Sequence, residues 1–350
     1  MHKPYGFGRF VFELCHALGS APSDIEYIVA VPSRIDVNGL PKLCNITWYR
    51  VADANFAWWE QRVIPELAKR LRCGVIHFPY NTRSVFAGSI PTVTTVHDLI
   101  FLSETFPLRL RWIKARLASM YVKFGFRFAT PRSRTIISIS RTTQQLLAHR
   151  GIPSEMVYNS IDGFLSLGPS TSRGRPGPPY LLHRGGHLPY RNTGRVIEAF
   201  RRARKEFNLV ADLKIIGVPD GADRWGRDAT IHYLQRISDN ELATLYAESA
   251  CVVSASLQEG FGLPIIEGFG FGTPVIASDL DPMREIAGDA ALLVNPYDIE
   301  AITRAMVAVL TDPGLAETLV QKGRDRMAVF AGKQVAEKMT NHYAAAFNGI

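Results

Sequence analysis

The chain has 350 residues, of which 47% are hydrophobic and 21% are charged. This length exceeds one ordinary domain and fits two, and the composition excludes a disordered or fibrous protein. Lys and Arg outnumber Asp and Glu by 40 to 32, and the formal charge of +8 weakly favours an anionic partner. No stretch is apolar enough to predict a signal peptide or a membrane-spanning helix. The four cysteines lie far apart without a Cys-x-x-Cys pair, which argues against a disulfide framework or zinc knuckle and predicts reduced thiols in a cytosolic protein.

The first half of the chain alternates between short apolar runs and helical patterns. The apolar runs predict buried strands at 27–31, 75–78, 92–97 and 135–139. The helical patterns cover 9–18, 58–71 and 108–128. Strands that alternate with helices predict a parallel sheet with both faces covered.

The second half repeats this alternation after a segment rich in Pro, Gly, Ser and Arg. That segment, 166–179, has almost no apolar periodicity and is typical of an interdomain linker. Strands are predicted at 180–183, 212–216, 231–233, 251–254 and 274–277, and helices at 193–205, 239–248, 263–270 and 299–310. Two α/β units of this kind are expected to bind a ligand in a cleft between them, beyond the carboxyl ends of their strands.

The most informative stretch runs from Ser254 to Pro296 and contains a glycine-rich turn between a strand and a helix. Glu259 follows the strand, and Gly260 and Gly262 allow the backbone to turn sharply. Glu267 lies about one turn into the helix, whose N-terminus suits a diphosphate. The alternative interpretation is a glycine-rich loop whose glutamates only cap the helix.

This stretch resembles the donor-binding signature of the retaining glycosyltransferases of family 4, which have the GT-B fold. The signature has two glutamates separated by seven residues, matched here by Glu259 and Glu267. The resemblance implies that Glu267 binds the ribose of a nucleotide sugar and that Glu259 lies beside the transferred sugar. The turn between them, implied to bind the donor, is formed by Gly260, Phe261, Gly262 and Leu263.

Residues 180–200 resemble the strand, loop and helix of this family whose basic residues hold the donor diphosphate. Arg191 falls where a phosphate-binding Lys or Arg is expected. An earlier basic position of many members aligns with Gly186, and Arg184, two residues before it, is a candidate to compensate. The alternative for either arginine is a solvated surface charge.

Two segments of the first half add candidate site residues. Gly6, Gly8 and Arg9 form a Gly-x-Gly-Arg turn before a helix, which predicts an anion site. The resemblance implies that this turn faces the donor phosphates and the acceptor, after a first strand for which this chain has no room. We therefore expect that the first strand is missing or that the true start lies upstream.

His97 and Asp98 end the strand 92–97, where ligand contacts of a parallel sheet are expected. The imidazole of His97 can form a hydrogen bond with the sugar or the acceptor, and Asp98 can orient the imidazole. The alternative is a structural histidine whose hydrogen bonds are satisfied within the fold.

Residues 109–134 contain eight Lys or Arg and no acidic residue, with aromatic and aliphatic residues between them. A basic amphipathic helix of this kind predicts contact with an anionic membrane surface, and the lipid-linked acceptors common in the family agree with it. The alternative is a solvated helix face. No nucleic-acid motif accompanies the basic residues, so nucleic acid is not an expected partner.

The sequence thus predicts two Rossmann-like α/β domains of the GT-B type. We expect an acceptor-side domain at 1–165, a linker at 166–179, a nucleotide-sugar domain at 180–333 and a C-terminal helix at 334–350 that packs back towards the first domain. The expected activity is metal-independent, cofactor-free transfer of a hexose, mannose by resemblance, to a saccharide or lipid-linked acceptor in surface polysaccharide assembly. The expected location is the cytoplasm or the inner face of the membrane.

The Asp-x-Asp triplet at 279–281 is not expected to bind metal. A non-catalytic nucleotide-sugar-binding subunit and a nucleotide-sugar epimerase are the alternatives.

Overall fold

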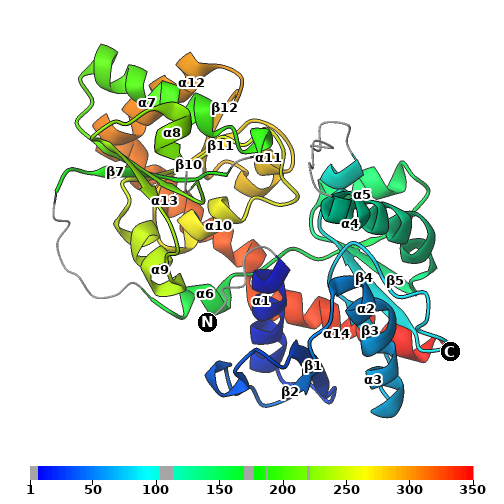
Figure 1. Ribbon diagram of the computed structural model, residues 1–350. Helices are drawn as coiled ribbons and strands as arrows, with labels where there is room; N and C mark the ends of the chain where they lie inside the picture. The colour runs from blue at the N-terminus through cyan, green and yellow to red at the C-terminus, as the bar shows by residue number, and fades with distance from the viewer. Residues whose placement is uncertain (1–6, 103–112, 169–176, 187, 219–220, 350) are drawn as a thin grey trace. The chain divides into compact units, whose positions relative to one another are not determined.

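The structure is a computed structural model that describes residues 7–102, 113–168, 177–186, 188–218 and 221–349. The chain forms two compact units (Figure 1). Unit 1 comprises Met1–Asp162 and Ala331–Ile350, and unit 2 comprises Gly163–Phe330. The predicted linker 166–179 therefore falls within unit 2, and its residues 169–176 lie outside the described part of the chain.

Unit 1 contains two parallel sheets. One pairs β1 (Tyr27–Pro32) with β2 (Ile46–Val51), and the other has the strand order β3-β4-β5-β6. The bounds of the second sheet are Ile76–Phe78, Thr92–Val96, Thr135–Ser138 and Glu155–Met156. Strands β2 and β6 were not among the predicted strands. In β2 the polar residues Thr47 and Arg50 interrupt the apolar run without strict alternation, and β6 has only two residues, so neither shows a clear strand pattern.

Helices α1 (Phe7–Ser20) and α14 (Gly332–Asn348) pack against each other in unit 1. Their apolar faces share a core with the strands, in which Leu14, Val93, Ile137 and Met339 are buried. The C-terminal helix thus belongs to unit 1 although unit 2 lies between it and the rest of that unit in the sequence.

In the part of unit 1 that the structure describes, the other helices contain two π-helical turns. Helix α2 (Phe56–Trp58) continues through a π-helical turn at Trp59–Val63 into α3 (Ile64–Arg70). Helix α4 (Ile113–Phe124) continues into a second π-helical turn at Gly125–Ala129. Helix α5 (Arg141–Ala148) starts at Ser140, whose hydroxyl accepts a hydrogen bond from the Thr143 N–H. The start of the predicted helix 108–128 lies outside the described residues.

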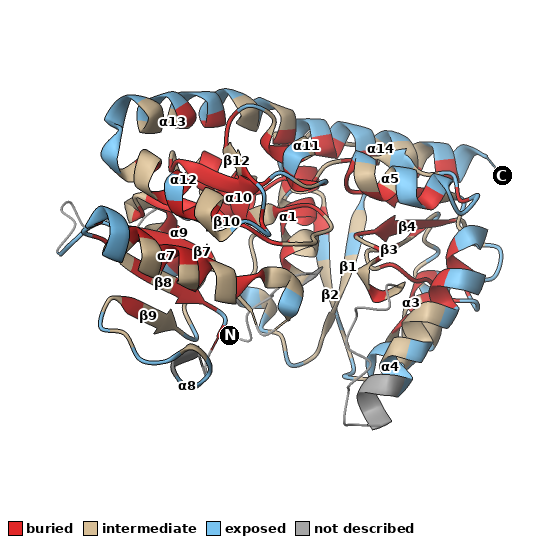
Figure 2. Ribbon diagram, turned by 90° about the horizontal axis from the view of Figure 1, so that it is seen from above, coloured by how far each residue is buried: buried red, intermediate tan, exposed pale blue. Residues whose placement is uncertain are grey.

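Unit 2 is built on one six-stranded parallel sheet with the order β12-β11-β10-β7-β8-β9. Figure 2 shows these strands largely in the colour of buried residues, and Leu181, Leu213 and Val252 have no exposed surface. The strand bounds are Tyr180–Arg184 (β7), Asp212–Ile216 (β8), Ile231–Leu234 (β9), Cys251–Ser254 (β10), Val275–Ser278 (β11) and Leu292–Val294 (β12). The first five were predicted, whereas the three-residue β12 is too short to show a pattern.

The helices of unit 2 include the four that the sequence predicts. Their bounds are Thr193–Phe207 (α7), Asp239–Glu248 (α9), Leu263–Gly270 (α10) and Ile299–Thr311 (α12). The predicted capping box of Ser238 and Glu241 is present at the start of α9. Among the described residues, four further helices were not predicted: α6 (Asp162–Leu165), which begins at the boundary of the units, α8 (Gly221–Trp225), α11 (Met283–Ala287) and α13 (Pro313–Met327).

None of the helices in the described part of the chain combines the length and the apolar character needed to cross a bilayer.

Candidate functional site

The predicted donor residues meet at the point of the unit 2 sheet where the strand order reverses. Strand β7 lies between β10 and β8, with Cys251 opposite Leu181 and Val252 opposite Leu182. From β7 the chain proceeds to β8 and β9 in one direction and later to β10, β11 and β12 in the other. The loops that leave the carboxyl ends of β7 and β10 therefore diverge and frame the usual ligand position of an open α/β sheet.

Two arginine–glutamate pairs connect these loops. Arg184, the last residue of β7, places its Nη1 2.6 Å from Oε2 of Glu267 on α10. Arg191, in the loop after β7, donates through its Nη1 to Oε1 of Glu259, in the loop after β10. The structure thus brings together the two glutamates and the two arginines that the sequence singled out.

Glu267 is fully buried and forms the centre of a charged network. Besides Arg184, the Tyr246 hydroxyl donates to Oε2 of Glu267 at 2.5 Å. The Tyr246 ring is itself buried and stacks on Phe271 with centroids 6.0 Å apart. Burial and the negative charge of Glu267 raise the pKa of Tyr246, so the phenol remains a donor. Burial disfavours the Arg184 cation, but the Glu267 carboxylate more than offsets this and raises the pKa of Arg184.

Glu259 lies in a turn that ends at the start of α10. The hydroxyl of Ser256 donates to its Oε1 at 3.0 Å. Gly262 has φ +107° and occupies the N-cap position of α10, where no side chain bonds to the first turn. Phe261 is buried and meets Phe330 edge to face at 5.9 Å. The turn therefore presents Glu259 beside the positive end of the α10 dipole, where an anion is stabilised.

Glycine at position 186 has a structural reason. A Cβ at this position would lie 2.9 Å from Cγ of Arg191. The Arg191 side chain therefore passes over Gly186 on its way to Glu259, and a larger residue would displace it. Position 186 therefore has no room for a basic side chain, because the Arg191 side chain occupies the space beside it.

Sequence reasoning missed three residues of this region: Asn192, Ser256 and Tyr246. Asn192 adopts the left-handed conformation at φ 58°, and its Nδ2 donates to the carbonyl oxygens of Ala255 at 2.8 Å and Pro296 at 2.7 Å. These bonds hold the start of α7 beside the end of β10. The sequence signal for Asn192 was an asparagine directly before a helical pattern, because asparagine tolerates the left-handed conformation.

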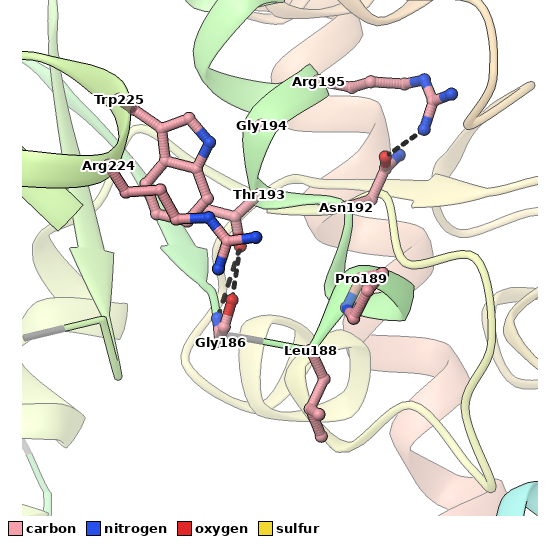
Figure 3. A pocket seen from close by; sticks show the side chains of 9 residues that line it. All are labelled: Gly186, Leu188, Pro189, Asn192, Thr193, Gly194, Arg195, Arg224 and Trp225. Carbon is pink, nitrogen blue, oxygen red and sulfur yellow. Dashed lines mark hydrogen bonds between the residues drawn. The ribbon is translucent and has the colours of Figure 1, made fainter. Parts of the chain in front are cut away.

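A pocket of about 400 Å³ lies at the N-terminus of α7 (Figure 3). Trp225 and Arg224 from α8 form one side of the pocket, across from Gly186 and Thr193. The Thr193 hydroxyl lies 3.3 Å from the Gly186 nitrogen and 3.4 Å from its carbonyl oxygen. None of Arg184, Arg191, Glu259 and Glu267 lines the pocket, because each arginine is directed to its glutamate.

In unit 1, His97 directly follows β4 and is buried. Its Nε2 donates to the Pro79 carbonyl oxygen at 2.8 Å, and its backbone N–H donates to Oδ1 of Asn81 at 2.7 Å. Phe10 meets the imidazole edge to face at 4.6 Å. Burial lowers the pKa of His97 to about 4, although the Pro79 carbonyl counteracts it. The imidazole is therefore neutral near pH 7. Asp98 is half-buried, and its Oδ1 accepts from the Ile100 N–H at 3.0 Å.

The predicted Gly-x-Gly turn is wrong where the structure describes it. Gly6 lies outside the described residues, but Gly8 and Arg9 lie within α1, which begins at Phe7. The apolar face that Leu14 and Leu18 bury favours extending the helix to this point. Arg9 is buried, with its Nη1 3.7 Å from Oε1 of Glu13.

The Asp-x-Asp triplet of unit 2 contacts an arginine. Oδ1 of Asp279 accepts from Nε of Arg284 at 2.6 Å, and Oδ2 of Asp281 lies 3.7 Å from Nη1 of the same side chain. Among the described residues no group of three or more His, Cys, Asp or Glu is arranged to hold a metal ion.

Comparisons with known proteins identify the family of the chain. A family profile described as Glycosyltransferase Family 4 matches residues 4–163, and one described as Glycosyl transferases group 1 matches residues 172–326. The chain is 29% identical to an O-antigen chain mannosyltransferase B of Escherichia coli over 47% of this chain and 45% of that protein. It is 25% identical to the O-antigen chain mannosyltransferase RfbU of Salmonella typhimurium over 77% of this chain and 73% of that protein.

The fold also matches solved structures. The sucrose-phosphate synthase of Thermosynechococcus elongatus superposes with a TM-score of 0.71 at 18% identity, covering 99% of this chain and 94% of that one. This likeness confirms the predicted GT-B fold. The matched region spans less than half of the Escherichia coli relative's length.

Proposed function

Because the chain belongs to glycosyltransferase family 4 and has the GT-B fold, we propose that it is a retaining enzyme that transfers a hexose from a nucleoside diphosphate sugar to a saccharide acceptor. The observation that carries the proposal is the meeting of Arg184, Arg191, Glu259 and Glu267 at the switch point of the unit 2 sheet. Two cations and a helix N-terminus there suit a diphosphate, and two carboxylates suit hydroxyl groups.

In the proposed mechanism, Arg191 and the N-terminus of α10 stabilise the negative charge that develops on the departing diphosphate. Glu259 lies beside the transferred sugar, and Glu267 accepts hydrogen bonds from the ribose. Because Arg191 is bonded to Glu259, a bound diphosphate competes with that carboxylate for the guanidinium. These groups supply the positive charge for the reaction, so the proposed enzyme requires neither metal nor cofactor.

We assign His97 and Asp98 to positioning the sugar or the acceptor. Their place at the carboxyl end of β4 supports this assignment, because ligands of parallel sheets bind there. With its Nε2 proton directed to Pro79, His97 acts as a fixed neutral imidazole and not as a general acid.

Mannose is the proposed sugar, and surface polysaccharide assembly is the proposed process. The O-antigen mannosyltransferases of Escherichia coli and Salmonella typhimurium support both. We further propose that the acceptor is lipid-linked and that the chain works on the inner face of the membrane, which it contacts through residues 109–134. The basic character of that segment supports the proposed location.

One observation favours a non-catalytic nucleotide-sugar-binding subunit as the second candidate. Glu267 has no exposed surface, so ligand hydroxyls reach it only if Arg184 moves. An enzyme must move Arg184 in every catalytic cycle. A subunit that binds the nucleotide sugar only through Arg191 need not move Arg184.

The test combines nucleotide binding with transfer. We expect one of GDP, UDP and ADP to raise the melting temperature of the chain, and the corresponding donor, GDP-mannose if the base is guanine, to be consumed. Glu259→Gln should abolish transfer but retain nucleotide binding. Glu198→Gln, on the exposed side of α7, is the matched control and should change neither. Nucleotide binding without transfer to any saccharide would favour the binding subunit, and no binding would contradict both candidates.

A further inference from the structure

Two buried polar side chains of unit 2, those of His183 and Thr193, have no part in the proposed mechanism. His183 lies on β7, and Thr193 is the first residue of α7. They are 1% and 3% exposed. Nδ1 of His183 lies 2.8 Å from the carbonyl oxygen of Val253 on β10, and its Nε2 lies 3.3 Å from Oγ1 of Thr193. The imidazole therefore connects the middle of the sheet to the N-terminus of α7.

The chemistry of these groups determines where the protons lie. A carbonyl oxygen only accepts hydrogen bonds, so Nδ1 of His183 carries a proton and donates it to Val253. Burial lowers the pKa of His183 to about 4, although the Val253 carbonyl counteracts it, and the imidazole is neutral near pH 7. Nε2 of a neutral imidazole with a protonated Nδ1 is an acceptor. The single hydroxyl proton of Thr193 is therefore directed to Nε2 of His183.

The Thr193 hydroxyl can then only accept a hydrogen bond from Gly186. Its oxygen lies 3.3 Å from the Gly186 nitrogen, which donates, and its 3.4 Å approach to the Gly186 carbonyl oxygen is a contact without a proton. The hydroxyl is enclosed, because a Cβ at Gly185 would lie 3.0 Å from its oxygen. Hydrogen bonds therefore run in one direction from the Gly186 N–H through Thr193 and His183 to the Val253 carbonyl. We call this chain of hydrogen bonds the His183 relay.

The His183 relay ends beside the Arg191 side chain. A Cβ at Gly186 would lie 2.9 Å from Cγ of Arg191, so the aliphatic part of this side chain packs directly on the Gly186 backbone. From there, Nη1 of Arg191 donates to Oε1 of Glu259. Movement of the Gly186 backbone towards Arg191 would therefore redirect the guanidinium.

We propose that His183 and Thr193 are positioning residues, and that the His183 relay holds the Gly186 backbone where Arg191 can reach the departing diphosphate. The inference rests on the proposed function, because it takes Arg191 as the group that binds the diphosphate. Neither His183 nor Thr193 touches the donor. Both act through Gly186 on the direction of the Arg191 side chain.

Direct binding of a ligand by Thr193 is the other role that its place would allow, because this residue lines the pocket of about 400 Å³ (Figure 3). The hydrogen bonds argue against it. The hydroxyl proton is directed to His183, and the oxygen accepts from Gly186. The residue is also only 3% exposed. The Thr193 hydroxyl is thus committed to the fold and has no proton to offer a ligand.

The first test compares two substitutions at position 193 by calorimetric titration with whichever of GDP, UDP and ADP binds most tightly. Thr193→Val keeps the shape of the side chain but leaves the Gly186 N–H and Nε2 of His183 without their partner. We expect it to weaken nucleotide binding at least about fivefold. Thr193→Ser keeps the hydroxyl and should bind within about twofold of the unchanged protein. Thr318→Val is the matched control, because Thr318 is exposed on α13 and bonds only to the Gly314 carbonyl of its own helix.

The second test distinguishes positioning of Arg191 from a general structural role. In an Arg191→Met background the guanidinium is absent, so Thr193→Val should weaken nucleotide binding no further. A general structural role would instead weaken binding by the same factor in both backgrounds. Thermal shifts at millimolar nucleotide extend this comparison to weak binding. If Thr193→Val does not fold, Thr193→Ala compared with Thr193→Ser replaces it in both backgrounds.

Nitrogen chemical shifts of labelled histidine test the relay in the unchanged protein. We expect His183 in the form protonated at Nδ1, in contrast to His97, whose Nε2 donates to Pro79. A His183 protonated at Nε2 would overturn the inference, as would unchanged nucleotide affinity in Thr193→Val or an equal loss in both Arg191 backgrounds. These outcomes leave the proposed function standing. Binding of no nucleotide to the unchanged protein would contradict the proposed function and this inference with it.

Discussion

The guanidinium of Arg184 lies 2.6 Å from Oε2 of Glu267 and pairs with a carboxylate that has no exposed surface. Tyr246 donates to the same oxygen at 2.5 Å. The carboxylate proposed to bind ribose is therefore held in a buried charged network. Access of a ligand to Glu267 requires that Arg184 move, which couples the position of this arginine to occupancy of the site.

Removing the Arg184 cation should destabilise unit 2 strongly. We expect Arg184→Met to lower the free energy of unfolding by about 3–5 kcal/mol, because it leaves the Glu267 carboxylate buried without its partner. The double variant Arg184→Met/Glu267→Gln should recover most of this loss, because the uncompensated charge is then absent. Urea denaturation of the two single variants and the double variant gives the coupling energy. A coupling energy near zero would show that the pair contributes nothing to folding.

Much of the candidate site could be predicted from sequence because its chemistry is local. The spacing of Glu259 and Glu267 around Gly262 marks a strand, a turn and a helix N-terminus, and the structure contains all three. The burial of Glu267 was not predictable in this way. It depends on Arg184 and Tyr246, which lie far from Glu267 in sequence and reach it only through the pairing of β7 with β10 and the packing of α9.

The same contrast applies to the fold. Apolar runs predicted β7, β10 and β11, because these strands are buried on both faces and have nearly continuous hydrophobic sequences. Strands β8 and β9 were also predicted, although they are only partly buried. Strand β12 has only three residues and α11 only five, so neither shows a periodic pattern. At Gly8 the local signal was misleading: glycine favours a turn, but the apolar face of α1 buried against α14 keeps it in the helix.

Replacing Gly186 should affect the site more than the stability of the fold. In Gly186→Ala the new Cβ would lie 2.9 Å from Cγ of Arg191, so Arg191 must move away from Glu259. We expect weaker nucleotide binding and at least about a tenfold loss of transfer, the scale of one lost charge-assisted contact. Calorimetric titration with the preferred nucleotide measures the first effect. Gly314→Ala, where the nearest atom lies 3.4 Å from the new Cβ, is the matched control. Equal loss in both variants would argue against displacement of Arg191.

Asn192 should stabilise the fold around the site. Asn192→Ala removes two hydrogen bonds to buried carbonyls and places alanine at φ 58°. We expect a loss of about 2–4 kcal/mol in the free energy of unfolding, from the unsatisfied carbonyls and the backbone strain together. Asn192→Gly removes only the hydrogen bonds, because glycine adopts this backbone conformation without strain. Denaturant titration of both variants separates the two contributions. Equal losses would mean that the backbone conformation is not strained.

The buried histidines should make the fold sensitive to mild acid. Burial lowers the pKa of His97 to about 4 and that of His183 to about 4, against the ordinary value of 6.5. The unfolded chain therefore binds more protons than the folded one between these values, and the free energy of unfolding falls as the pH drops from 6.5 towards 4. For His97 alone the full loss is on the order of 3 kcal/mol.

His97→Gln isolates this contribution, because the glutamine amide can still donate to the Pro79 carbonyl but does not titrate. We expect the variant to lose less stability than the unchanged protein between about pH 7 and about pH 4.5, with the difference approaching the value for His97. Urea denaturation at a series of pH values measures it. The same change at His232, which is partly exposed and pairs with Asp212 at 2.9 Å, is the control and should leave the acid-induced loss largely in place. If His97→Gln and the unchanged protein lose stability in parallel, the imidazole is not held neutral by burial, and its assigned role as a fixed neutral group beside the sugar would have to be abandoned.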